Sequence, residues 1–197
     1  MRILAFSDLH HSRPRADAIV AASAGADLVI GAGDFCNMRK GLPEAIGLLA
    51  GLGAPMIAVP GNAETAGELA DAAAAGTVVL HGQGTIFGGL AVFGLGYGVP
   101  VTPFGDWSCD LSEADAAALL AACEAADIMV FHSPPKGVVD RTSAGKSAGS
   151  VAIHDAIERV QPRLALCGHI HDSWGREDTI GATRVVNLGP EPNWFEM

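Results

Sequence analysis

Acidic, amide and imidazole side chains follow short apolar runs at five separate places in the sequence. The runs are read as buried strands because they are short, apolar and bounded by Gly, Pro or polar residues. The side chains that follow them belong to Asp8, His10, Asp34, Asn62, His132, His169 and His171. A single histidine of this kind is more often structural than functional. Seven such residues at five strand ends favour one shared site, because the carboxyl ends of strands in an α/β sheet gather ligands at one edge.

These seven side chains have the chemistry of metal ligands. Imidazole and carboxylate groups suit Mn, Fe, Zn or Ni ions, and the set lacks the cysteine thiolates of structural zinc sites. Seven ligands are too many for one ion, whereas a one-metal hydrolase or oxygenase would need only a compact facial triad. We therefore expect two metal ions that share a bridging carboxylate.

The elements that must position these residues follow alternating strand and helix patterns. Helical patterns cover residues 14–24, about 43–53 and 64–75, and two more helices follow the capping residues Ser112 and Ser150. Strands are expected at 2–7, 27–30, 55–59, 127–131 and 163–167, with antiparallel strands between 77 and 95 and a closing hairpin at 179–188. The pattern predicts an α/β protein with two mixed sheets packed face to face and flanked by helices, in one domain over residues 1–197.

Composition narrows the classes of function. The net charge of −10 would repel nucleic acid polymers and anionic membranes. The apolar runs are too short to span a membrane, and charged residues near the N-terminus interrupt any secretory signal. Four widely spaced cysteines without a C-x-x-C motif are typical of a reduced compartment. We expect a cytoplasmic protein that binds neither nucleic acid polymers nor membranes.

The ordered motifs resemble those of the calcineurin-like metallophosphoesterase superfamily, whose pattern is D-x-H, G-D-x-x-D, G-N-H-D/E, a lone H and G-H-x-H. This chain has Asp8-x-His10, Gly33-Asp34, Gly61-Asn62, His132 and Gly168-His169-x-His171. The resemblance covers nearly the whole chain and implies a four-layer α-β-β-α sandwich. Residues 132–137 and 168–175 further resemble a small phosphodiesterase-like subgroup, whose members act on phosphodiesters such as cyclic nucleotides.

The resemblance also implies a ligand set for each of two divalent ions. One ion would be held by Asp8, His10, Asp34 and His171. The other would be held by Asp34, Asn62, His132 and His169, with Asp34 bridging. Mn²⁺ is the expected metal, with Fe, Zn, Ni or Mg as alternatives. Asp34, Asn62 and His132 are then the expected catalytic residues, around a bridging hydroxide that attacks phosphorus.

Two positions depart from the family pattern. The family's histidine after the asparagine, a proton donor or transition-state contact, is replaced here by Ala63. The acid that orients this histidine in related phosphatases is replaced by Asn37. A missing general acid costs about 10² to 10⁴ in rate, most of all for poor leaving groups. We therefore expect slow turnover of alkyl monoesters and faster turnover of diesters or activated aryl esters, with His11 as the nearest candidate for a substitute donor.

The sequence gives weaker indications of a functional role for several other residues. Asn62, Lys136 and Arg141 are predicted substrate contacts, although the two cations could equally be solvated charges. Glu64 and Asp172 adjoin ligands and could hydrogen-bond to metal-bound histidines. The aromatic residues of the irregular segment 96–110, together with a later tryptophan, could line the site or pack in the core. They are Tyr97, Phe104, Trp107 and Trp174.

The sequence thus predicts a dinuclear metal-dependent phosphoesterase that hydrolyses a small phosphodiester, such as a cyclic nucleotide. The alternative hypothesis is a catalytically weak scaffold protein that keeps the fold and binds metal or phosphate, as Ala63 and Asn37 would permit. The complete ligand set favours the enzyme, because a scaffold has no need of all seven side chains. The sequence does not indicate the oligomeric state.

Overall fold

Strands and helices alternate along much of the chain, and the computed structural model describes all 197 residues. The first elements in chain order are β1 (Arg2–Phe6), α1 (Arg13–Ser23), β2 (Leu28–Ala32), α2 (Leu42–Gly47), β3 (Met56–Val59), α3 (Ala66–Ala72) and β4 (Val78–Val79). They are followed by β5 (Gln83–Phe87), β6 (Leu90–Leu95), α4 (Glu113–Leu120), β7 (Ile128–Phe131), α5 (Val151–Val160), β8 (Leu164–Cys167), the short 3₁₀ helix η1 (His171–Ser173), β9 (Glu177–Ile180), β10 (Thr183–Asn187) and β11 (Asn193–Glu196). None of the helices is long and apolar enough to cross a membrane.

The strands form two mixed sheets. One sheet has five strands in the order β11-β1-β2-β3-β4, and the other has six in the order β5-β6-β7-β8-β10-β9. Within each sheet the central strands are parallel, while β11, β5 and β9 are antiparallel to their neighbours. Because the central strands are parallel, their carboxyl ends lie along one edge of each sheet.

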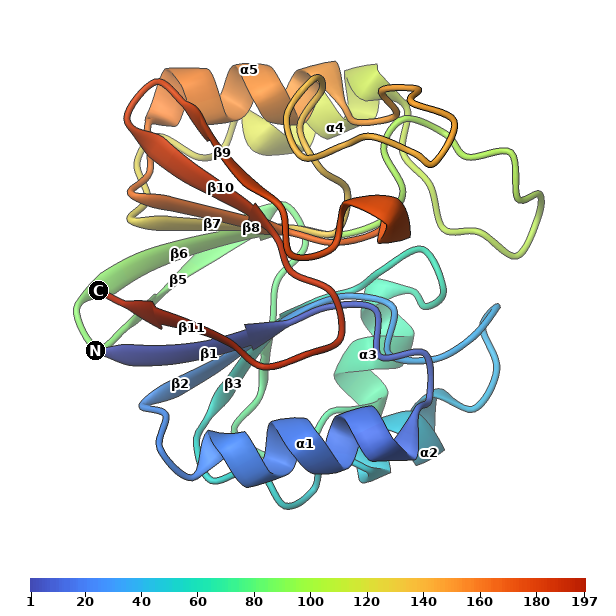
Figure 1. Ribbon diagram of the computed structural model, residues 1–197, viewed down its shortest axis with the longest axis vertical. Helices are drawn as coiled ribbons and strands as arrows, with labels where there is room; N and C mark the ends of the chain where they lie inside the picture. The colour runs from blue at the N-terminus through green and yellow to red at the C-terminus, as the bar shows by residue number, and fades with distance from the viewer.

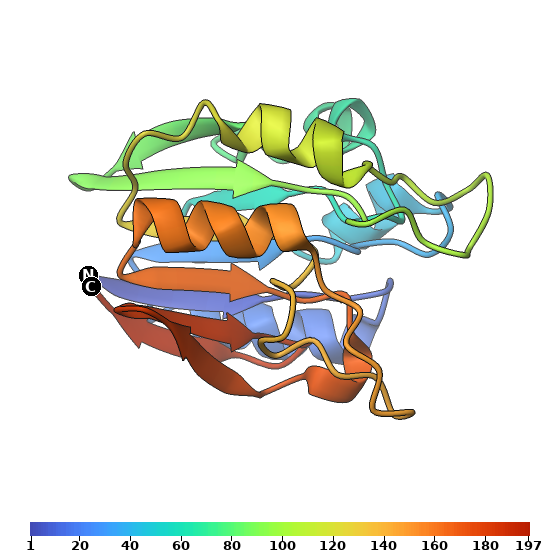
Figure 2. The ribbon, with the colours of Figure 1, turned by 90° about the horizontal axis from the view of Figure 1, so that it is seen from above.

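Figures 1 and 2 show four layers, and three apolar cores lie between them. The middle core lies between the two sheets and includes Ile30 and Val130. An outer core lies between the first sheet and α1, α2 and α3. The other outer core lies between the second sheet and the helices α4 and α5, and it includes Ile153. This arrangement confirms the α-β-β-α sandwich of two mixed sheets flanked by helices.

Several local predictions are confirmed. The side chain of Ser112 accepts a hydrogen bond from the amide of Asp115 and so caps α4. Ser150 caps α5 in the same way through the amide of Ile153. The hairpin predicted at 179–188 forms as the antiparallel pair β9–β10.

Other predictions are wrong in detail. The strands between 77 and 95 are not all antiparallel, because β4 pairs in parallel with β3 in the first sheet and only β5 and β6 pair with each other in the antiparallel sense. The second helix ends at Gly47, and the third spans only Ala66–Ala72. The sequence pattern also missed β11, which pairs with β1 across the whole length of the chain.

Candidate metal centre

The predicted ligand residues meet where the parallel strands of both sheets end. They form two groups, and within each group the possible ligand atoms all lie within 4.8 Å of one another. The first group is Asp8, His10 and His171, and the second is Asp34, His132 and His169. Each group combines side chains from both sheets, so the site exists only because the two sheets pack face to face.

Asp34 lies between the two groups. Its Oδ2 is 3.7 Å from Nε2 of His10, and its Oδ1 is 3.4 Å from Nε2 of His132. The predicted seventh ligand, Asn62, joins the second group with its Oδ1 3.1 Å from the same Nε2 of His132. One carboxylate therefore faces both sets of imidazoles, which is the placement that a shared ligand requires.

Four of these residues have a left-handed backbone conformation. The φ angles are 54° for Asp8, 48° for His10, 58° for Asp34 and 66° for His169. Non-glycine residues rarely adopt positive φ, and those that do concentrate at functional sites, where the surrounding structure holds them in place. The backbone thus turns sharply after these strands, where the ligand side chains come together.

Close packing explains the glycines beside two of the ligands. A Cβ atom at Gly61 would overlap Oδ1 and the backbone nitrogen of Asp34. A Cβ atom at Gly168 would overlap Oγ of Ser7 and lie 2.6 Å from Oδ2 of Asp8. Glycine is therefore needed at both positions so that neighbouring loops can approach the carboxylates.

Backbone carbonyls orient two of the imidazoles. Nδ1 of His10 is 3.3 Å from the carbonyl oxygen of Cys36, and Nδ1 of His132 is 2.9 Å from that of Ala32. When Nδ1–H donates to a carbonyl, the unprotonated Nε2 is left free to bind a metal. In both residues Nε2 points toward Asp34.

The two acids predicted to support metal-bound histidines make other contacts. The buried carboxylate of Glu64 accepts hydrogen bonds from the amides of Asp34 at 2.8 Å and Gly61 at 2.7 Å, so it holds the ligand loops by their backbone. The carboxylate of Asp172 accepts from the amide of Ser143 instead. No sequence pattern indicated the role of Trp174, whose indole N–H donates to Oδ2 of Asp8.

The electrostatics of the cluster suit cations. Burial, together with the nearby charge of Asp8, raises the pKa of the Asp34 carboxyl to about 7. Burial also opposes ionisation of Asp8, but its hydrogen bond with His171 and the charge of His132 hold its pKa below the usual value. Desolvation and the charge of His132 lower the pKa of His169 to about 3, which keeps that imidazole neutral and able to coordinate. Two closely placed carboxyl groups among four imidazoles thus fit a pair of divalent ions.

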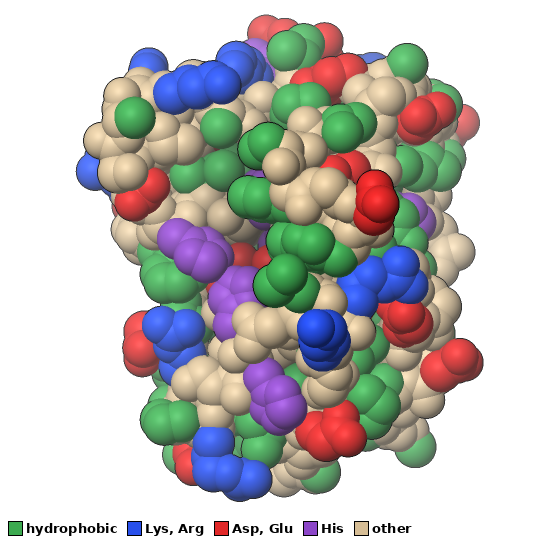
Figure 3. Space-filling model, turned by 90° about the vertical axis from the view of Figure 1, so that its right-hand side faces the viewer, with side chains coloured by type: hydrophobic (Ala, Val, Ile, Leu, Met, Phe, Trp, Pro, Cys, Tyr) green, Lys and Arg blue, Asp and Glu red, His purple; other side chains and the backbone are tan.

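A cavity of about 310 Å³ opens onto the cluster. Its walls include His10, Asp34, Asn62, His169 and His171. Figure 3 shows the face at which the strands end, with histidine side chains near its middle beside a group of hydrophobic side chains. The ligand atoms can therefore be reached by a small molecule from solvent.

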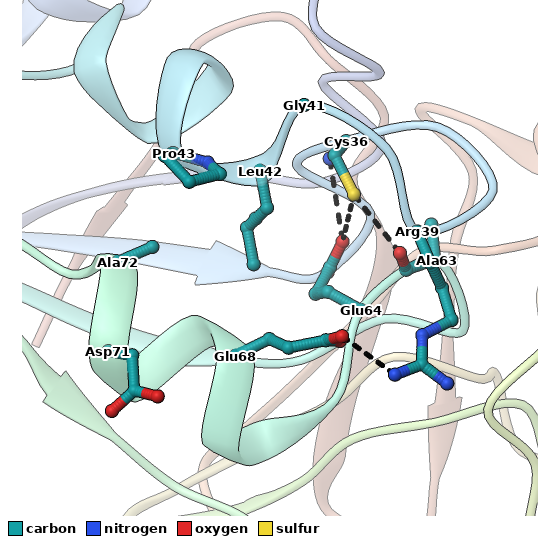
Figure 4. Close-up of a pocket in the computed structure, with 10 residues that line it drawn as sticks. All are labelled: Cys36, Arg39, Gly41, Leu42, Pro43, Ala63, Glu64, Glu68, Asp71 and Ala72. Carbon is teal, nitrogen blue, oxygen red and sulfur yellow. Dashed lines mark hydrogen bonds and ion pairs between the residues drawn. The ribbon is translucent and has the colours of Figure 1, made fainter.

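The two positions that depart from the family pattern supply no proton donor to this cavity. Ala63 is buried and lines a neighbouring cavity of about 480 Å³ between α2 and α3, shown in Figure 4. Asn37 uses its side-chain amide to donate to the carbonyl oxygen of His10 at 3.0 Å. His11 is exposed and lies against the chain near Gly41, outside the cavity at the cluster.

The two predicted cationic contacts lie apart from the ligand cluster. Nζ of Lys136 donates to the carbonyl oxygen of Ser147 at 2.9 Å. Arg141 donates to the carbonyl oxygen of Gly145 and lines a different cavity beside β9. Both side chains are bound to their own loop, so their contact with substrate stays a prediction.

The fold and the site together define a class of metal-dependent phosphoesterases, and sequence comparison agrees. The model of the calcineurin-like phosphoesterase superfamily domain matches residues 1–194. The chain belongs to this superfamily.

The individual proteins that match this chain share little of its sequence or cover only part of it. A nematode protein, UPF0046 protein T07D4.2 of Caenorhabditis elegans, is 31% identical over 105 residues; the match covers 50% of this chain and 26% of that protein. The structure of TT1561 from Thermus thermophilus matches with a TM-score of 0.75 and 18% identity, over 98% of this chain and 97% of that one. Phosphopantetheinyl hydrolase from Mycobacterium tuberculosis matches with a TM-score of 0.59 and 16% identity, over 95% and 89%. At these identities, the structural matches show the fold alone.

Proposed function

We propose that this chain hydrolyses phosphodiesters with the help of two divalent metal ions, with Mn²⁺ as the expected metal. The observation that carries the proposal is the position of Asp34, whose two carboxylate oxygens face His10 on one side and His132 on the other. Two such ions, when bound, lower the pKa of a water molecule to supply the nucleophile and neutralise charge on the phosphoryl oxygens.

The predicted ligand residues would be shared between the two ions. Asp8, His10 and His171 would hold one ion, while His132, His169 and Asn62 would hold the other, with Asp34 shared. The amide nitrogen of Asn62 donates to Oγ of Ser108 at 3.0 Å, which turns its oxygen toward the imidazole of His132. This orientation would keep the oxygen of Asn62 available as a ligand.

The preference for diesters follows from what the site lacks. Ala63 has no ionisable group, and its side chain packs in the core beside α3. Without a donor at this position, the leaving oxygen must depart with little protonation, which penalises poor leaving groups most. Diesters with good leaving groups, and activated aryl esters, are therefore the expected substrates.

The test is a leaving-group series on Mn²⁺-loaded protein. We expect kcat/KM for aryl phosphodiesters to fall steeply as the pKa of the leaving phenol rises, and to exceed that for the matching monoesters. A flat dependence on leaving-group pKa would contradict the missing donor, and faster hydrolysis of the monoesters would contradict the diester assignment.

Matched histidine variants connect the activity to the cluster. We expect His132→Ala to lower kcat/KM by about 10²-fold or more, because it removes a ligand that holds a catalytic ion. His154→Ala changes a histidine of α5 that lies outside the cluster, and it should leave the rate unchanged. Equal loss in both variants would assign the activity to something other than this site.

The absence of a donor at Ala63 also favours one other hypothesis, a scaffold that binds metal or phosphate without useful catalysis. It predicts tight phosphate binding by Mn²⁺-loaded protein and no diester turnover above that of His132→Ala. The complete ligand set at both groups favours the enzyme.

A further inference from the structure

We propose that Phe104 and Trp107 form a binding subsite for a planar aromatic group of the substrate, beside the metal cluster. The two rings are stacked, with centroids 5.6 Å apart and an angle of 15° between their planes. Both line the cavity of about 310 Å³ that also contains His10, Asn62 and His169. A phosphate ester bound at the cluster would therefore place its organic group against these rings.

The structure separates this pair from the other aromatic residues near the cluster. The hydroxyl of Tyr97 accepts a hydrogen bond from the amide of Ala66, and its ring lies 4.2 Å from that of His81. The indole of Trp174 is engaged with Asp8. Tyr97 and Trp174 thus have structural partners and do not line this cavity.

The loop that carries the pair is attached directly to a ligand residue. Oγ of Ser108, next to Trp107, accepts a hydrogen bond from the side chain of Asn62 at 3.0 Å. The amide of Cys109 donates to the backbone carbonyl of Asn62 at 2.9 Å. Phe104 approaches the ring of His169 edge-on, with centroids 6.4 Å apart. These contacts fix the position of the aromatic rings relative to the ligand cluster.

The exposure of the pair is consistent with a binding role. Phe104 is 49% exposed, whereas Trp107 is partly buried against the core between the first sheet and its helices. An aromatic group of a ligand would cover the exposed ring and gain the stacking that nucleobases gain on such side chains. A cavity of this volume is at the small end of ligand sites, which span about 300 to 1,000 Å³, so the occupant is a single small ester rather than a polymer.

Polar groups in the same cavity favour a nucleoside over a simple aryl group as the organic part of the ligand. Thr142 and Asp172 line the same cavity. Thr142 Oγ1 accepts from the amide of Lys146, which leaves its hydroxyl hydrogen free to donate. Asp172 accepts from the amide of Ser143 through one oxygen, and the second oxygen is available to a sugar hydroxyl. The substrate class indicated is therefore a phosphate ester of a nucleoside.

This inference rests on the proposed function for the placement of the phosphate, but its test does not require turnover. Adenosine 5′-monophosphate, phenyl phosphate and methyl phosphate are titrated into the Mn²⁺-loaded full chain and binding is measured by calorimetry. Stacking of one base is worth roughly a 5- to 150-fold difference in binding. We expect the adenosine ester to bind at least about 10-fold more tightly than methyl phosphate, with phenyl phosphate between them.

Variants of Phe104 and Trp107 test whether these two residues form the aromatic subsite. Phe104→Leu and Trp107→Leu should each remove most of the preference for the aromatic probes and leave methyl phosphate binding unchanged. Phe104→Tyr should retain the preference, and Trp194→Leu, a change to an exposed tryptophan on β11 away from the cavity, should not affect it. Phe104 is exposed, so its replacement leaves the core intact.

Three outcomes would overturn all or part of the inference. Equal binding of the three probes, or a preference that survives both leucine variants, would exclude an aromatic subsite here. Tighter binding of phenyl phosphate than of the adenosine ester would exclude the nucleoside assignment. Hydrolysis of methyl p-nitrophenyl phosphate, measured separately, tests the proposed function: its absence while the probe preference persists would refute the enzyme and retain the subsite.

Discussion

The indole N–H of Trp174 donates a hydrogen bond to Oδ2 of Asp8 at 3.0 Å, across 166 positions of sequence. Oγ of Ser7 donates to the same carboxylate oxygen at 2.6 Å. Oδ1 lies 3.7 Å from Nε2 of His171 and faces the first ligand group. Trp174 and Ser7 therefore fix one oxygen of a buried carboxylate, while the other accepts from the amide of His169 at 3.2 Å and faces the metal-ligand group.

Replacement of Trp174 by phenylalanine should weaken metal binding. The variant keeps an aromatic ring against His171 but removes the donor to Asp8, and loss of such supporting contacts typically costs about 10- to 100-fold in metal affinity. Calorimetric titration with Mn²⁺ measures the change, with Trp194→Phe as the matched control. Unchanged affinity in Trp174→Phe would show that Asp8 is oriented without the indole.

Replacement of Gly168, which packs against Asp8, should also weaken metal binding. In Gly168→Ala the new methyl group would overlap Ser7 and displace the carboxylate of Asp8, so we expect at least about a 10-fold loss of Mn²⁺ affinity. The control is Gly67→Ala in α3, where a Cβ atom meets nothing within 4 Å and alanine favours the helix. That variant should bind Mn²⁺ normally and melt at the same temperature or slightly higher. Normal binding by Gly168→Ala would refute the close-packing argument.

The raised pKa of Asp34 predicts a pH dependence of stability in chelator-treated protein. Its pKa is 3.8 ordinarily and about 7 in the folded chain, so between these values the folded state holds a proton that the unfolded state has released. The contribution of Asp34 to the free energy of unfolding therefore falls as the pH rises from about 4 to about 7. Asn cannot ionise, so the melting temperature of Asp34→Asn relative to the unchanged protein should increase between pH 5 and pH 8. A difference that shrinks or stays constant over this range would contradict the raised pKa.

Much of the site could be predicted from the sequence because its signals are local. Asp8, Asp34 and His132 each stand within two residues of the end of a short buried strand, and parallel strands carry such residues to one edge without further information. The layered fold followed from the alternation of strand and helix patterns for the same reason.

The features of the fold and the site that the sequence did not predict depend on contacts between distant segments. β4 has only two residues, so nothing in its sequence shows that it pairs in parallel with β3. The bond from Trp174 to Asp8 and the backbone contacts of Glu64 arise from packing between loops. The role of Phe104 was equally open, because only the folded loop shows that its ring lies at the mouth of the site rather than in the core.

Restoration of the family's histidine should not restore a proton donor. Position 63 is buried in the core beside α3, so a histidine there would overpack the core by roughly 1–3 kcal/mol. We expect Ala63→His to lower the melting temperature and leave hydrolysis of alkyl monoesters slow. A gain of about 10²-fold or more on alkyl monoesters would show that the side chain reaches the cluster and acts as the missing acid.

The central claim, that the seven residues hold two ions around Asp34, is tested most directly by counting bound metal. Protein dialysed against Mn²⁺ is analysed by elemental mass spectrometry in the His154→Ala background, which removes a separate surface group formed by His154, Asp155 and Glu158 on α5. We predict two Mn²⁺ ions per chain, about one after further replacement of His171 or His132 by alanine, and none retained tightly in Asp34→Asn. One ion per chain before these replacements, or two ions retained in Asp34→Asn, would contradict the shared two-metal site.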